Sequence, residues 1–289
     1  MTLAPPGPWQ RWDLHPSVVI GLVLLGGLYV SLGGLRARPR RVASFAAALV
    51  VLFLALNGPL HNLSDSYLFS AHMVQHLVLT LVFPPLLLYG TPAWVVRPLL
   101  GPPAVFRVAR WATRPLIAGV IFSAPITLWH FPRFYEAALE HHALHIVQHL
   151  VFLATAVIMW WPVLSPVPEL PRASYLAQLL YLFALGLPMS LAGALITLAD
   201  RVLYPFYVAA PRVWEGLAPL ADQQLGGLLM WVVGTIYLWG AASVVWFRWS
   251  VREERGDADG AVPLEAYGNA EFGMRNAERR GPGSNTETT

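Results

Sequence analysis

Long apolar runs recur through this chain and restrict its fold more than any other feature. Each run is roughly 20 residues long, enough for an α-helix to cross a hydrocarbon core about 30 Å thick. Only 12% of the 289 residues are charged, about half the share typical of soluble domains. The sequence therefore predicts an all-α integral membrane protein. We expect seven transmembrane helices at residues 17–35, 43–58, 67–90, 115–130, 143–163, 174–198 and 223–247.

The arginines give the predicted helices a direction. All 19 basic residues are arginines, and most follow the first, third, fifth or seventh predicted helix. Because basic residues are retained on the cytoplasmic side, we place the N-terminus outside and the C-terminus in the cytoplasm. Their distribution among membrane-flanking links, despite a net charge of +3, also argues against nucleic acid as a partner.

This topology divides the chain into three parts. We expect residues 1–16 to form an outer N-terminal segment and residues 17–250 to form the seven-helix membrane domain. Residues 251–289 are polar and lack apolar periodicity, which predicts a disordered cytoplasmic tail.

Two near-identical histidine motifs lie at the start of the third and the fifth predicted helix. HMVQHLV (72–78) and HIVQHLV (145–151) differ only in their second residue. A second repeated motif, FYEAA (134–138) and FYVAA (206–210), follows the fourth and the sixth predicted helix. We therefore predict a parallel repeat of two-helix units, formed by predicted helices 3–4 and 5–6.

Each motif places two imidazoles on one helix face, because residues i and i+4 are neighbours on an α-helix. His72, His76, His145 and His149 would then meet inside the bundle near its outer face. Four buried imidazoles are costly in a membrane unless something satisfies them. A transition metal does so directly, and we predict a metal site formed by these four residues.

Other polar side chains at the same level could complete the site. Methionine beside imidazole would favour copper, as Cu(I), although methionine in a membrane helix can equally serve packing. His61, His141 and His142 lie at the predicted rim and are candidates for metal uptake. We expect additional ligands, or groups that hold the ligands by hydrogen bonds, among Asp222, Met73, Met189, Met230, Gln75, Gln148, Gln223, Gln224 and His130. The chain has no cysteine, which excludes disulfides and thiolate metal sites.

Four segments resemble the CtaG proteins, seven-helix assembly factors for the caa3-type cytochrome c oxidase of bacteria. They are HNLSDSYLFSAHMVQHLVL (61–79), LWHFP (128–132), HHALHIVQHLVFLATAVIMWWPVL (141–164) and DQQLGGLLMW (222–231). The resemblance extends from about residue 15 to 250. It implies a multi-pass protein of the bacterial cytoplasmic membrane that acts with oxidase subunits. It also implies a role in supplying or inserting copper from the outer side.

Other functions stay open at this point. Three of the histidines with Asp222 could form a membrane zinc hydrolase, although Met73 and Ile146 replace the glutamate of an H-E-x-x-H motif. Haem could bind in place of a metal ion. A copper permease would need a polar path through the inner half, where the sequence is apolar. A metal-free scaffold for oxidase subunits would use the histidines only for hydrogen bonds between helices.

Overall fold

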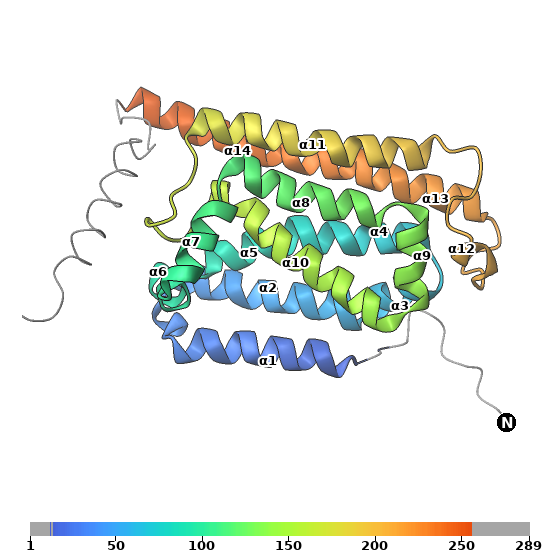
Figure 1. Ribbon diagram of the computed structural model, residues 1–289, viewed down its shortest axis with the longest axis horizontal. Helices are drawn as coiled ribbons and strands as arrows, with labels where there is room; N and C mark the ends of the chain where they lie inside the picture. The colour runs from blue at the N-terminus through green and yellow to red at the C-terminus, as the bar shows by residue number, and fades with distance from the viewer. Residues whose placement is uncertain (1–11, 13, 256–289) are drawn as a thin grey trace, which may run out of the picture.

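The computed structural model describes Trp12 and residues 14–255, and its regular elements are helices (Figure 1). Helix α1 and the helices of the candidate spans are α1 (Pro16–Ser31), α2 (Pro39–Asn57), α4 (Phe69–Leu77), α5 (Phe83–Gly90), α7 (Pro103–Ala112), α8 (Pro115–Trp129), α10 (His142–Leu164), α11 (Tyr175–Thr197), α13 (Pro219–Leu228) and α14 (Gly234–Glu254). The other helical elements are η1 (Gly34–Arg36), α3 (Pro59–Ser66), η2 (Val78–Val82), α6 (Ala93–Val96), η3 (Arg97–Leu100), α9 (Pro132–Glu140), α12 (Phe206–Ala209) and η4 (Leu229–Val233).

Five helical segments are long and apolar enough to cross a membrane: α2, α4 through α5, α10, α11, and α13 through α14. A sixth span results if α7 and α8, which meet at an 81° bend, are taken together. Helix α1 is apolar but has only 16 residues. It ends before the predicted boundary at residue 35, because Gly33 adopts a left-handed conformation with φ 76°. The all-α membrane class is thus confirmed, while seven spans, their sidedness and the parallel repeat stay predictions.

The last span is longer than the sequence predicts. It runs from Pro219 to Glu254, whereas the prediction was residues 223–247, so the helix continues past residue 251, where we expected the tail to begin. The rest of the predicted tail, and all of the predicted outer segment except Trp12 and residues 14–16, lie outside the described residues.

A π-helical turn, η2, joins α4 and α5 into one span. Pro84 follows it and has no N–H group, so the carbonyl of Thr80 loses its usual helical partner. The indole Nε1 of Trp160, in α10, donates to this carbonyl at 3.0 Å. The proline that interrupts the helical bonding thereby helps to fix α10 against α4 and α5.

Short helices cover the two ends of the bundle (Figure 1). At one end, α3, α9 and α12 surround the first turns of α4, α10 and α13. Every histidine of the chain belongs to, or directly adjoins, an element at this end, which we call the histidine end. At the opposite end lie α6 and α7, with the arginine-bearing links after α1, α5 and α10; we call it the arginine end.

Apolar side chains fill the bundle and cover its outer face. Phe69, Met73, Phe152 and Met159 belong to the largest buried cluster. On α11, a stripe of exposed residues at helical spacing faces outward: Leu180, Phe183, Leu187, Leu191 and Leu195. An exposed apolar stripe of this length is what a lipid solvent requires.

Candidate metal centre

The four predicted imidazoles lie together at the histidine end. Their ring centroids are 4.2 Å apart for His72 and His76 on α4, and 4.3 Å apart for His145 and His149 on α10. Between the helices, His72 lies 5.6 Å from His145 and 6.5 Å from His149. His76 lies 5.8 Å from His149. The spacing of i and i+4 on two helices has thus produced one cluster of rings.

Most ring nitrogens of this cluster lack a protein partner. The four side chains are 1% to 8% exposed. Across the part of the chain that the structure describes, neither nitrogen of His72 or His76 is hydrogen-bonded, nor is Nε2 of His145 or His149. A buried polar atom without a partner costs about 1–3 kcal/mol. So many of them in one place make the cluster a candidate metal-binding site.

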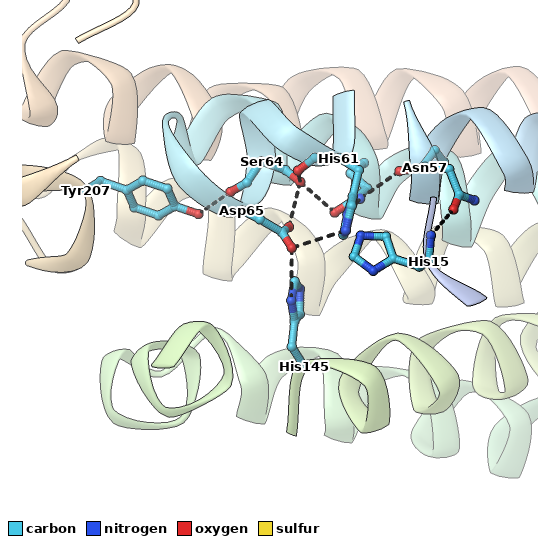
Figure 2. Close-up of polar contacts among 9 residues, drawn as sticks. His15, Asn57, His61, Ser64, Asp65, His145 and Tyr207 are labelled. Atoms are coloured by element: carbon cyan, nitrogen blue, oxygen red, sulfur yellow. Dashed lines mark hydrogen bonds and ion pairs between the residues drawn. The ribbon is translucent and has the colours of Figure 1, made fainter. Parts of the chain in front are cut away.

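Asp65 brings a carboxylate to the cluster that the sequence reasoning missed. Its Oδ2 lies 3.3 Å from Nδ1 of His145 and 3.4 Å from Nε2 of His61 (Figure 2). One ligand atom from each of Asp65, His72 and His145 lies within 4.8 Å of the other two. The available signal was the His61–Asp65 pair at i and i+4, in a polar stretch that we read as a link before the third helix.

The hydrogen bond to Asp65 sets which ring nitrogen of His145 acts as the donor. Although burial favours the neutral acid, the bond from His145 and the nearby imidazoles of His145, His61 and His72 lower the pKa of the Asp65 carboxyl well below its usual range. An ionised carboxylate accepts hydrogen bonds, so His145 Nδ1 carries the proton. Its Nε2 then has a free lone pair, and carboxylate–histidine–metal arrangements use this geometry.

A polar network behind Asp65 holds α3 in place (Figure 2). The Gln75 amide donates to the Ala55 carbonyl at 2.7 Å and to Nδ1 of His61 at 2.9 Å. Ser64 Oγ lies 2.9 Å from Asp65 Oδ1, and its carbonyl accepts from the Tyr207 hydroxyl at 2.9 Å. Gln75 therefore contacts the candidate site indirectly, through His61.

Gln148 occupies the position in α10 that Gln75 has in α4, but its surroundings differ. Its side chain is 1% exposed, and both amide atoms lack a hydrogen-bond partner among the described residues. It adds an amide to the set of buried polar groups without partners at this end of the bundle.

Asp222, Gln223 and Gln224 do not support the rings as the sequence suggested. The Asp222 carboxylate accepts from the backbone N–H groups of Phe69 at 2.7 Å and Ser70 at 3.2 Å, and from the Ser70 hydroxyl. It thereby caps the first turn of α4. The Gln223 and Gln224 amides bond to the backbone of the link between α11 and α12. These three residues lie at the same end of the bundle as the histidines, but their hydrogen bonds go to the start of α4 and to the link after α11.

The three methionines proposed as ligands pack in the hydrophobic core. A side chain on Gly226 would meet Met73, and one on Gly234 would meet Met189, so these thioethers fill gaps beside α13 and α14. Met230 belongs to the same buried cluster. The packing interpretation therefore accounts for all three, and they give no support to Cu(I).

His130 lies beside the cluster, 6.0 Å from the ring of His76. Its Nδ1 bonds to the Ile126 carbonyl, so Nδ1 carries the proton and Nε2 has the lone pair. Burial lowers the pKa of His130 and keeps the ring neutral. Nε2 is buried with no partner among the described residues, which makes His130 a fifth candidate nitrogen.

A cavity of about 480 Å³ opens between α1, α2 and α10 next to the cluster. Five histidines line it: His15, His61, His142, His145 and His149. The backbone N–H of His15 donates to Asn57 Oδ1 at 2.8 Å (Figure 2), and its ring lies 4.6 Å from His61 and 5.9 Å from His142. Of the predicted uptake residues, His61 and His142 line this cavity. His141 is exposed outside the cavity lining, where its Nδ1 bonds to the Ala137 carbonyl.

The sequence of the membrane domain identifies its family. Residues 24–252 match the family described as cytochrome c oxidase caa3 assembly factor (Caa3_CtaG). The chain belongs to this family. The resemblance seen in the histidine motifs is thus confirmed. The matched range includes the candidate donors described above: Asp65, His72, His76, His130, His145 and His149.

The Caa3_CtaG chain is also similar to mycobacterial proteins described as uncharacterized. It is 27% identical over 233 residues to one from Mycobacterium bovis and one from Mycobacterium tuberculosis, which is 73% of this chain and 35% of each relative. A Mycobacterium leprae protein is 25% identical over 245 residues, or 76% of this chain and 36% of the relative. The chain spans about a third of the length of these curated relatives. No solved structure matches it.

Among the described residues, the donors gathered at the Caa3_CtaG site are imidazole nitrogens and a carboxylate. Imidazole nitrogens bind copper, zinc, iron and nickel, and a single carboxylate is compatible with each of them. Because the donors come from α3, α4, α10 and the residue that follows α8, a bound ion would also tie these segments together.

Proposed function

We propose that this chain takes part in cytochrome c oxidase assembly by binding copper at the histidine cluster and delivering it to the oxidase. Membership of the caa3 assembly factor family supports the assembly role. The observation that carries metal binding is the set of buried imidazole nitrogens without partners among the described residues, with Asp65 beside them. The site would face the outer side of the bacterial cytoplasmic membrane, as the arginine distribution predicts.

The ligands in this proposal are His72, His76, His145 and His149. Asp65 would hold His145 through Nδ1, so that Nε2 faces the ion. A site of nitrogen donors binds Cu²⁺ more tightly than Zn²⁺ in the Irving–Williams order. With the thioethers in the core, we expect Cu²⁺ rather than Cu⁺ to be the better-bound form.

The interior beyond the cluster supports delivery rather than transport across the membrane. Phe152 and Met159 on α10, and Leu79 and Leu81 on the facing span, are buried and apolar. Phe152, Leu79 and Leu81 offer no ligand to a copper ion, and Met159 offers one thioether, a soft donor that suits Cu⁺ rather than Cu²⁺. Copper that reached the cluster would therefore leave by the histidine end.

We propose that copper enters through the cavity between α1, α2 and α10. His142 is exposed at this cavity, while His145 and His149 form its buried wall. His142→Ala should slow copper loading without lowering the amount bound at equilibrium, whereas His141→Ala, one residue away and outside the cavity lining, should load at the native rate. Equal loading rates for the two variants would exclude this route.

One observation favours a second candidate, a zinc-dependent hydrolase. Asp65, His72 and His145 alone form a compact three-ligand group, and three protein ligands with an open fourth position are typical of catalytic zinc. Zinc bound in preference to copper, with a water-exchangeable position, would support this function over copper delivery.

The assembly role can be tested in a bacterium that makes a caa3-type oxidase and lacks its own assembly factor. We expect the native chain to restore the copper content of the purified oxidase, and His72→Ala with His76→Ala to fail although the protein reaches the membrane. His141→Ala is the matched control and should restore copper fully. Normal oxidase copper with the double variant would disprove the role of the cluster.

A further inference from the structure

A basic cavity lies at the arginine end, where the start of α11 and the end of α14 run side by side (Figure 1). Its volume is about 250 Å³, and Arg172, Arg248 and Arg252 line it. Ser165 and Gln178 supply polar groups to the same lining. The cavity is on the opposite end of the molecule from the histidines and has no part in the proposed copper site.

Within the described residues, the arginines of this cavity form no ion pair with a carboxylate. Arg172 donates from Nε to the Ser165 carbonyl at 3.3 Å, and the Arg252 guanidinium lies 5.7 Å from the ring centre of Tyr175. Within residues 14–255, the ion pairs do not include Arg172, Arg248 or Arg252. Burial, and then the charge of Arg248, lower the pKa of Arg172. Like charges that share a cavity repel one another, and an anion among them would remove this cost.

An apolar groove continues from the basic cavity toward the middle of the bundle. Its volume is about 380 Å³, and it shares Val163 and Arg248 with the basic cavity. Trp160 lines one side and Tyr237, Ala241 and Val244 line the other. On α14, residues 237, 241, 244, 248 and 252 recur at helical spacing, so one helix face is apolar along the groove and basic at its end.

We propose that the basic cavity and the groove together bind one anionic phospholipid. The phosphate would lie among the arginines, whose planar guanidinium groups bind phosphate oxygens in pairs. An acyl chain would lie in the groove between α10 and α14. The basic cavity lies at the end of the bundle and the apolar groove lies toward its middle, which is the arrangement of headgroup and acyl chain in a bilayer lipid. Basic pockets between transmembrane helices bind anionic headgroups in this way. A free phosphate ion would use the arginines but not the groove.

The test uses the full chain purified in detergent, with lipid binding measured by native mass spectrometry and by the shift in unfolding temperature. Phosphatidylglycerol, phosphatidylcholine and inorganic phosphate serve as separate probes. Arg172→Gln with Arg248→Gln removes two charges from the cavity. Arg38→Gln with Arg107→Gln is the matched control, because it removes two exposed charges from the same end. Gly240→Leu places a side chain in the groove, which Gly240 lines; a Cβ atom at this position would meet no atom of the described residues within 4 Å.

We expect phosphatidylglycerol to bind and stabilise the native chain, and phosphatidylcholine and phosphate to do neither. The Arg172/Arg248 double variant should weaken phosphatidylglycerol binding about 10-fold or more, and Gly240→Leu should weaken it while leaving the arginines in place. The Arg38/Arg107 control should bind as the native chain does. Equal stabilisation by phosphate alone would replace the lipid with a soluble anion. Equal loss in the control, or full binding by the two site variants, would also overturn the proposal.

Discussion

A histidine binds a metal through one ring nitrogen, and the partner of the other nitrogen sets its orientation. Asp65 supplies that partner for His145 at 3.3 Å. The sequence revealed the histidines because i and i+4 spacing is a local property of a helix. It did not reveal Asp65, since α3 ends at Ser66 and the chain turns before α4 begins at Phe69. Helical spacing in the sequence does not show the direction of the Asp65 side chain, so its approach to α10 could not be predicted.

Asp65→Asn should lower copper affinity about 10- to 100-fold, the usual effect of losing a group that orients a metal ligand. The amide keeps the shape of the side chain but lacks the charge that holds the proton on His145 Nδ1. Copper affinity can be measured by competition with a chelator of known strength. Asp200→Asn, an exposed change at the same end, should have no effect, and native affinity in Asp65→Asn would contradict the role given to Asp65.

At the scale of the helices, the ligand-bearing turns depend on contacts between segments far apart in the chain. Asp222 at the start of α13 caps α4, 153 residues earlier. A carboxylate at a helix N-terminus satisfies free N–H groups and interacts favourably with the helix dipole. From the sequence, Asp222 was assigned to the metal site only because it lies at the same level of the bundle as the histidines. That level does not show whether its carboxylate contacts a ring nitrogen or a backbone N–H group. The long apolar spans α2, α10 and α11 were predictable because the sequence shows directly how long each apolar run is. The end of α1 at Ser31 depends on the backbone of Gly33, and the short helices α3, α9 and α12 were not predicted.

Asp222→Ala should destabilise the protein by about 2–3 kcal/mol, because three hydrogen bonds to a charged acceptor are lost from the buried end of α4. Thermal unfolding of the metal-free protein in detergent measures the effect. Asp200→Ala removes an exposed carboxylate and should leave the unfolding temperature unchanged. If Asp222→Ala instead unfolded normally and lost copper, the carboxylate would belong to the metal site, as the sequence first suggested.

The whole molecule has two chemically different ends, one with the histidines and one with most of the arginines. The positive-inside rule predicts that the arginine end faces the cytoplasm. Copper delivery to an outward-facing partner requires the same orientation, so the topology and the proposed function depend on one another.

Cysteine labelling can establish this orientation, because the chain contains no cysteine of its own. Asp200→Cys places an exposed thiol at the histidine end, and Ala104→Cys places one at the arginine end. A membrane-impermeant thiol reagent added to intact cells should label the first variant only. Both should react once the membrane is opened, and the reverse pattern would place the histidines in the cytoplasm.

Metal content under competition tests the central claim most directly. Purified chain would be exposed to equal amounts of Cu²⁺ and Zn²⁺, washed, and analysed for both elements, beside His141→Ala and a variant with His72, His76, His145 and His149 all changed to alanine. We predict copper on the native chain and on His141→Ala, and none on the fourfold variant. Copper retained by the fourfold variant, or no metal on the native chain, would contradict a copper site at the histidine cluster.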